Sequence, residues 1–260
     1  PGTVTATSYE GSGANLTGIS AGFDADVSKI AIGTGAGTNS QGAQGIAIGL
    51  NAGSASQGIS TVAIGYEAAK NSQGNNAIAM GNTAGNASQG GGAVGIGYQA
   101  GYNAQGANAI AIGWQAGCGD QGIGSVAIGD EAGQNSQGDI AVAIGDMAGM
   151  NSQGSTTVAI GDRAGQNVQG GYGIGIGWIA GRDSQSTFSI AIGAAAAHSL
   201  QHVRTICLNA TGSGVNTAGT DRFLVAPIRN SGALSYNSST REVYGNSSDD
   251  RVKHNESYIK

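Results

Sequence analysis

The chain has 260 residues, of which 49 are glycine, 5% are aromatic and 10% are charged. Large aliphatic residues are sparse for an ordinary globular core, yet the formal net charge of −5 is too small for a typical disordered chain. Mild acidity without a basic stripe argues against nucleic-acid binding. No apolar run is long enough to span a bilayer, and no signal peptide is recognisable, so we expect no membrane insertion.

Residues 1–29 precede a long array of repeats and lie outside its period. Residues 4–9 could form a strand, and residues 11–19 form a glycine-rich turn that leads into an apolar anchor. Because the open end of a stack of strands invites further pairing, we expect this segment to be a cap or a linker.

Residues 30–202 consist of eleven copies of a sixteen-residue unit, without insertion or deletion. The unit is clearest at residues 126–138, Val-Ala-Ile-Gly-Asp-Glu-Ala-Gly-Gln-Asn-Ser-Gln-Gly. An Ile or Val begins every copy, a glycine follows three residues later, and a glutamine holds one register throughout. A fixed period of this kind indicates stacked units.

The composition of one unit predicts a coil of a parallel β-solenoid. Each copy opens with an apolar triplet, such as Val126-Ala127-Ile128. Positions one and three of this triplet share one face of a strand, and the alanine between them takes the other face. Two glycine-bearing corners follow, and interior glycines would cost a helix about 1 kcal/mol each. The predicted fold class is therefore all-β, and we expect neighbouring chains to cover the apolar faces of such thin coils.

The glutamine column has two interpretations. The favoured one is structural, with each side-chain amide bonded to the backbone or to the next amide. The alternative is a polar track that binds a ligand.

The residue directly after the triplet's glycine is the most variable position and is predicted to face water. Exposed aromatic residues on a rigid ladder could stack on sugars or contact a receptor. Packing within the corner or against an adjacent chain is the favoured alternative. The candidate receptor contacts at this position are Tyr66, Tyr98, Trp114 and Trp178.

Three successive coils carry an aspartate at the same position, namely Asp130, Asp146 and Asp162. Stacked roughly 4.8 Å apart, these carboxylates repel one another, so they are either fully solvated or share a cation. We favour solvation and predict no metal and no cofactor.

The two cysteines are predicted to be free thiols. Cys118 and Cys207 lie more than five coils apart, on the order of 25 Å along the stack, which is beyond disulfide reach. Free thiols fit synthesis in a reducing compartment.

Residues 203–247 break the period. Apolar stretches that begin near Phe223, Ala233 and Glu242 are separated by Asn, Ser and Gly turns and are predicted to be short strands. We interpret this region as a strand-rich collar.

Known solenoid enzymes fit this chain poorly. Sixteen is not a multiple of the six-residue acyltransferase repeat, and His198, His202 and His254 lie at or beyond the end of the array. No paired carboxylates recur as in a glycosidase. The solenoid is therefore predicted to be structural and not an enzyme.

The Val-Ala-Ile-Gly strand, the following alanine and the glycine corner resemble the head repeats of trimeric autotransporter adhesins, the YadA-like heads. The resemblance covers about two-thirds of the chain and implies a homotrimer of left-handed parallel β-rolls.

Residues 248–253, Ser-Asp-Asp-Arg-Val-Lys, resemble the start of the endosialidase-type intramolecular chaperone of viral fibres and tailspikes. The resemblance implies cleavage between Ser248 and Asp249, with Ser248 as nucleophile and Lys253 as its activating base. A neutral amine can play this part without histidine. Only seven residues follow Lys253, so we expect residues 248–260 to be the start of a truncated chaperone that cannot cut itself. The start at Pro1 fits a fragment or processed form.

These features together predict a viral or phage fibre component, made in the host cytoplasm and located in the virion. Its expected partners are two further copies of itself and a host-cell receptor, for which a glycan is one candidate. The alternatives are the head of a bacterial trimeric adhesin, which should continue into a coiled coil and membrane anchor, and a solenoid enzyme acting on glycans.

Overall fold

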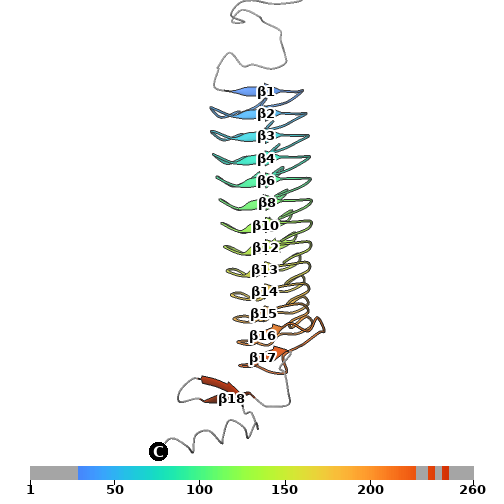
Figure 1. Cartoon of the computed structure of the whole chain (residues 1–260). Helices are drawn as coiled ribbons and strands as arrows, with labels where there is room; N and C mark the ends of the chain where they lie inside the picture. The colour runs from blue at the N-terminus through green and yellow to red at the C-terminus, as the bar shows by residue number, and fades with distance from the viewer. Residues whose placement is uncertain (1–28, 227–233, 238–241, 246–260) are drawn as a thin grey trace, which may run out of the picture.

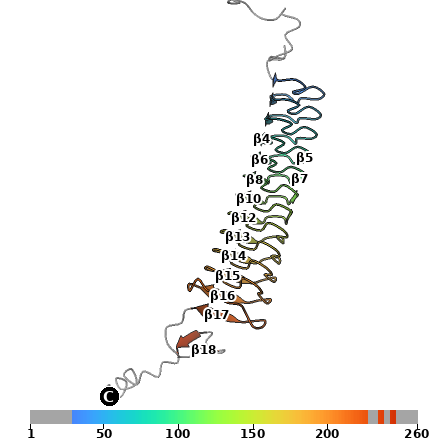
Figure 2. The same cartoon turned by 90° about the vertical axis from the view of Figure 1, so that its right-hand side faces the viewer.

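The computed structural model describes residues 29–226, 234–237 and 242–245. The described part is a parallel β-solenoid of about 12 coils, drawn as an elongated stack in Figures 1 and 2. The sequence-based prediction of an all-β parallel solenoid is confirmed, and no helix able to cross a membrane occurs in this part of the chain. The predicted cap over residues 1–29 lies, apart from Lys29, outside the described residues.

A thirteen-stranded parallel sheet runs the length of the stack. Each coil of the repeat contributes one strand, and each pairs in register with the strand sixteen residues later, as Val126 does with Val142. The strands are β1 (Ile30–Ile32), β2 (Ile46–Ile48), β3 (Val62–Ile64), β4 (Ile78–Met80), β6 (Val94–Ile96), β8 (Ile110–Ile112), β10 (Val126–Ile128), β12 (Val142–Ile144), β13 (Val158–Ile160), β14 (Ile174–Ile176), β15 (Ile190–Ile192), β16 (Ile206–Asn209) and β17 (Phe223–Ala226).

A second, smaller parallel sheet forms around the glutamine column. Its two-residue strands are β5 (Ser88–Gln89), β7 (Ala104–Gln105), β9 (Asp120–Gln121) and β11 (Ser136–Gln137). Isolated parallel bridges extend the same column from Gln41 to Gln89 and from Gln137 to Gln201. Every coil therefore has two walls, one built on the apolar triplet and one on the glutamine.

The interior of the stack is lined almost entirely by alanine and glutamine. The middle residue of the triplet and the alanine of the following corner have no exposed surface, as at Ala127 and Ala132. The first and third residues of the triplet point outward and are half-buried or exposed, with Ile96 37% exposed and Ile160 36% exposed. The alternation predicted for the triplet is confirmed, and it leaves the larger aliphatic side chains on the outer face.

The buried glutamines bond as the structural interpretation predicts. Gln169 Nε2 donates to the carbonyls of Val158 at 2.8 Å and Gly173 at 3.2 Å, and also to Gln185 Oε1 at 3.0 Å. One side chain thus satisfies backbone acceptors on both sides of the corner and ties its coil to the next.

The stack continues beyond the regular repeats. Ile206 of β16 pairs with Ile190 of β15, and Phe223 of β17 pairs with Ile206 although seventeen residues separate them. Further on, β18 (Leu234–Asn237) and β19 (Glu242–Gly245) form an antiparallel pair. The strands predicted near Phe223, Ala233 and Glu242 are therefore present.

Both cysteines are free, as predicted. Cys207 is fully buried in β16, and Cys118 is partly buried in a corner. Burial raises the pKa of each thiol, which lowers the reactive thiolate fraction at neutral pH.

Candidate functional site

The candidate receptor contacts lie where the chain leaves the large sheet and turns the first corner. Gly113 adopts φ +132°, and a Cβ atom there would lie 2.3 Å from the carbonyl oxygen of Gly129 in the next coil. Only glycine fits, because neither the backbone conformation nor the space admits a side chain. Two residues later Gln115 takes a left-handed conformation, with φ +50°. The residue between them, Trp114, is left 46% exposed.

The structure brings two of the four predicted aromatic residues together. Tyr98 and Trp114 lie in adjacent coils, and their rings stack with centroids 6.1 Å apart and planes inclined by 11°. Tyr66 and Trp178 are comparably exposed, at 47% and 49%, but other coils separate them from this pair. The candidate site is therefore the Tyr98–Trp114 stack, with two outlying aromatic residues on the same edge.

A chain of side-chain amides runs along this edge. Gln115 Nε2 donates to Gln99 Oε1 at 2.7 Å, and Gln134 Nε2 donates to Gln115 Oε1 at 2.7 Å. Gln99 and Gln115 directly follow Tyr98 and Trp114, so the two rings are bordered by amide groups held in place between coils. Flat rings with adjacent amides can accept the apolar face of a sugar and hydrogen-bond its hydroxyls.

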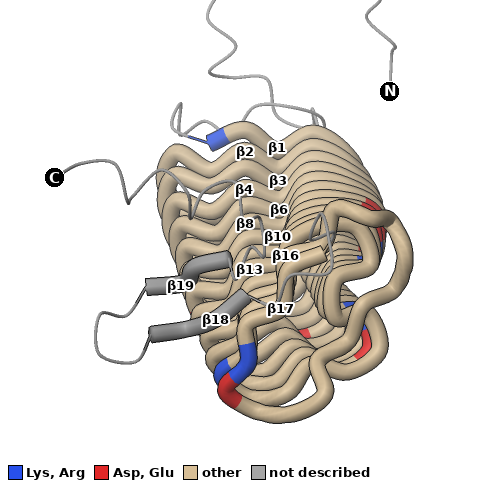
Figure 3. The backbone as a smooth tube through the Cα atoms, turned by 60° about the horizontal axis from the view of Figure 1, so that its bottom comes forward, with Lys and Arg blue, Asp and Glu red and all other residues tan. Residues whose placement is uncertain are grey.

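The three stacked aspartates fill the edge between Trp114 and Trp178. Asp130 and Asp146 are exposed, and Asp162 lies 3.8 Å from Arg163, an exposed ion pair of the kind that contributes little to stability. Within the described residues no group of three or more His, Cys, Asp or Glu side chains could hold a metal ion. Figure 3 shows how few charged residues the coils carry elsewhere.

An ion pair borders Tyr66 at the other end of this edge. Lys70 Nζ lies 2.8 Å from Glu67 Oε1. This hydrogen bond lowers the pKa of the Glu67 carboxyl and raises the pKa of the Lys70 amine. Both charges are therefore retained over the ordinary pH range.

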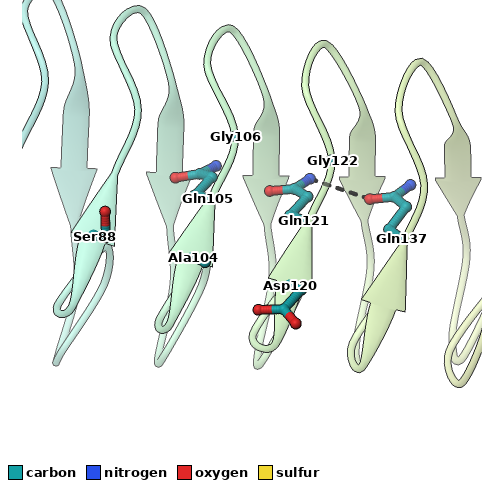
Figure 4. Close-up of a pocket in the computed structure, with 8 residues that line it drawn as sticks. All are labelled: Ser88, Ala104, Gln105, Gly106, Asp120, Gln121, Gly122 and Gln137. Carbon is teal, nitrogen blue, oxygen red and sulfur yellow. Dashed lines mark hydrogen bonds between the residues drawn. The ribbon is translucent and has the colours of Figure 1, made fainter.

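A shallow depression over the small sheet offers little for binding. Figure 4 shows Gln105, Gln121 and Gln137 stacked in register, with Asp120 pointing away from them. The Nε2 atoms of Gln105 and Gln121 donate at 2.7 Å to the carbonyls of Val94 and Ile110, respectively. These donors serve the fold, so this geometry favours the structural interpretation of the column over a ligand track.

A second aromatic stack was not predicted from the sequence. Tyr172 and Phe188 lie at the opposite corner, two residues before the triplet, with ring centroids 4.9 Å apart and planes inclined by 6°. They are 58% and 57% exposed, more than any of the four predicted aromatic residues. Their sixteen-residue spacing in the sequence indicates that these two rings lie in adjacent coils. Our prediction of aromatic contacts considered only the position after the triplet's glycine and therefore missed them.

The predicted cleavage residues, Ser248 and Lys253, and the scissile bond to Asp249 lie outside the described residues. Comparison with protein-family models, curated proteins and solved structures gives no match to this chain. The resemblances to adhesin heads and fibre chaperones thus rest on the motifs themselves.

Proposed function

We propose that this protein is a structural and adhesive component of a viral or phage fibre. In this proposal three chains associate through their solenoids and present a rigid surface to a host-cell receptor. The chain is not an enzyme, apart from a self-cleavage junction at Ser248 and Lys253 that matures the fibre when a complete chaperone follows. The virion is the expected location.

The apolar outer face of the large sheet is the observation that carries the proposal. The third residue of the triplet is 36% to 41% exposed on β1, β4, β6, β13 and β15, where it is Ile32, Met80, Ile96, Ile160 and Ile192. A continuous aliphatic column of this length is unfavourable in water. Burying the same face of each copy around a threefold axis removes it from solvent.

The resemblance to YadA-like heads supplies the finer parts of the proposal, which are the left-handed coil and the threefold symmetry. The collar predicted over residues 203–247, whose first two strands, β16 and β17, extend the solenoid sheet, would continue the trimer towards the chaperone. Long pairing between chains forms slowly because its contacts are distant in sequence, which explains why a removable chaperone is useful.

The receptor surface in this proposal is the aromatic edge centred on Tyr98 and Trp114, with Tyr66 and Trp178 as outlying contacts. Their rings are 42% to 49% exposed and are held by corners whose backbone bonds link each coil to the next, as Gln115 N does with Tyr98 O at 2.8 Å. A preformed surface loses little conformational entropy on binding.

Light scattering of the protein tests the trimer. The expected mass is three times the chain mass of 25.4 kDa, and a monomer would contradict the proposal. The double variant Ile96→Glu/Ile160→Glu places charges on the outer face and should dissociate the trimer. The matched control, Ser88→Glu/Ser152→Glu, places the same charges at exposed positions on the opposite wall and should leave the mass unchanged.

A further inference from the structure

The corner before the triplet carries a column of exposed side chains towards the C-terminal end of the stack. The backbone nitrogens of Tyr172, Phe188 and Arg204 donate to the carbonyls of Ser155, Gly171 and Thr187, one coil earlier, at 3.2 to 3.3 Å. The residues at this corner are therefore neighbours along the stack. From coil to coil the column consists of Ile140, Thr156, Tyr172, Phe188, Arg204 and Asp221, and we call it the corner column.

Every member of the corner column has a left-handed backbone, with φ between +55° and +61°. Asparagine and glycine adopt this conformation most readily, and earlier coils use Asn76, Gly92 and Asn108 at the same position. Tyrosine and phenylalanine pay a conformational penalty here and also expose more than half of their surface. Neither feature stabilises the fold, and strained exposed residues of this kind point to a function.

One ring face of the stack is open. Phe188 is covered on one side by Tyr172, but the neighbour on the other side of Tyr172 is Thr156, whose short side chain cannot cover a phenol ring. Beyond Thr156 comes Ile140, which is 66% exposed. Ile140 and Tyr172 are two coils apart, roughly 9.6 Å at the spacing of paired strands. A ring packed on both faces needs two carbon–carbon gaps of about 3.5 to 4.0 Å each, so the interval between Ile140 and Tyr172 over Thr156, which we call the notch, is long enough for one ring.

A charge-neutral polar group lies at the other end of the stack. Arg204 forms two hydrogen bonds to Asp221, from Nε to Oδ1 at 2.6 Å and from Nη2 to Oδ2 at 3.0 Å. The two side chains remain 61% and 58% exposed. Because the guanidinium is already neutralised by the carboxylate, it does not select an anion, but both groups retain free sites for hydroxyls.

We propose that the corner column is a second ligand site, which takes an uncharged oligosaccharide. One sugar ring enters the notch and stacks on Tyr172, and a further sugar unit bonds through its hydroxyls to Arg204 and Asp221. The proposal deepens the adhesive function proposed above and depends on it for its biological meaning. The corner column is one side chain wide, and Thr156 and the Arg204–Asp221 ion pair border its rings. Stable protein–protein interfaces need a much larger surface, so this site favours a sugar over a protein partner.

The double variant Tyr172→Asn/Phe188→Asn tests the site, because asparagine already occupies this position in two coils. The probe is an array of neutral, sialylated and sulfated oligosaccharides, followed by titration with the neutral compound that binds best. We expect at least a tenfold loss of affinity for that compound and an unchanged or higher melting temperature. Arg204→Gln/Asp221→Asn should weaken the same binding. The matched control, Leu50→Asn/Ile59→Asn, removes two comparably exposed apolar side chains from coils far from Tyr172 and should retain it.

Four outcomes would overturn this inference: unchanged affinity in the Tyr172/Phe188 variant, a lower melting temperature, binding of charged glycans only, or no glycan bound at all. A change of oligomeric mass in this variant would likewise overturn it, by assigning the corner to an interface between copies. The fibre proposal is tested independently of the glycan site: it fails if the unmodified protein is a monomer in light scattering. The glycan titration can be interpreted whichever mass is found.

Discussion

Gln89 donates a hydrogen bond from Nε2 to Oε1 of Gln105, one coil further along the stack, at 3.0 Å. Both side chains are almost completely buried, with 2% and 3% of their surface exposed. A hydrogen bond between coils inside a narrow interior couples neighbouring coils more specifically than alanine contacts can. The glutamine column is therefore the polar spine of the solenoid.

Replacing one glutamine of this column should destabilise the stack. Gln169→Leu removes three hydrogen bonds donated by Nε2, to Val158 O, Gly173 O and Gln185 Oε1, although Gly173 O still accepts from Val158 N at 2.9 Å. We expect a loss of about 3 kcal/mol, since a typical hydrogen bond contributes about 1 kcal/mol to stability. Chemical denaturation measures the change. The control Gln166→Leu, at a half-buried corner position, should stay within about 0.5 kcal/mol of the unmodified protein. Equal effects at both positions would contradict the role of the column.

The corner glycine before Trp114 should tolerate no side chain. In Gly113→Ala the new methyl group meets the Gly129 carbonyl oxygen at 2.3 Å, in addition to the strain of φ +132°. We expect a loss of about 3 kcal/mol or more. Gly124→Ala is the control, because it has a positive φ of +63° but no atom within 4 Å of the added carbon. Its loss should be about 1 to 2 kcal/mol. A comparison of melting temperatures decides whether close approach between coils or backbone strain dominates.

The free energy of unfolding should fall in acid because of one ion pair at a corner of the stack. Arg182 holds Asp183 through two hydrogen bonds, of 2.9 and 2.8 Å, and thereby lowers the pKa of that carboxyl below its ordinary value of 3.8. Because the folded pKa is the lower one, the stabilisation is present above pH 3.8 and disappears as the pH falls through the folded pKa.

NMR titration of the Asp183 carboxyl checks this prediction directly. In Arg182→Gln the main cause of the shift is removed, so the Asp183 pKa should rise towards 3.8, although the hydrogen bond from Asn167 at 2.9 Å remains. Asp183→Asn should remove this contribution to the acid dependence of the unfolding free energy. A pKa that does not respond to Arg182→Gln would show that the ion pair is not its cause.

The proposed junction after Ser248 can be tested in a polypeptide that carries it together with a complete chaperone domain of the resembling type. Ser248→Ala should leave the chain uncut on a denaturing gel, because no hydroxyl remains to attack the peptide bond. Lys253→Met should have the same effect, since the serine then lacks a base. Cleavage at the normal rate in either variant would remove that residue from the proposed mechanism.

Much of the fold could be predicted because the period itself encodes the register. When Val126 and Val142 occupy the same place in successive units, their pairing follows without any knowledge of the tertiary structure. The continuation through β17 was harder to predict, because one added residue between Ile206 and Phe223 ends the numerical period while the strand still pairs. Hydrogen bonding depends on the strand positions and tolerates a longer corner between them.

The candidate site was predicted only in part. Exposure of Tyr66, Tyr98, Trp114 and Trp178 follows from their corner position, and the structure agrees. Only Tyr98 and Trp114 lie in adjacent coils, and the sixteen-residue period already places them there. The left-handed backbone of Tyr172 and Phe188 had a signal in the sequence, because asparagine and glycine occupy the same place in other coils, but our prediction did not use it.

The sequence by itself determined the repeat, the strand in each coil and the buried glutamine bonds, since all three follow from chemistry repeated every sixteen residues. Only the tertiary structure decided how exposed and how strained each corner is and in what geometry neighbouring rings meet, as Tyr172 and Phe188 do with centroids 4.9 Å apart. The physical reason is that a period specifies which residues are equivalent, whereas exposure and strain depend on the backbone angles of the corner and on the size of the side chains one coil above and one coil below.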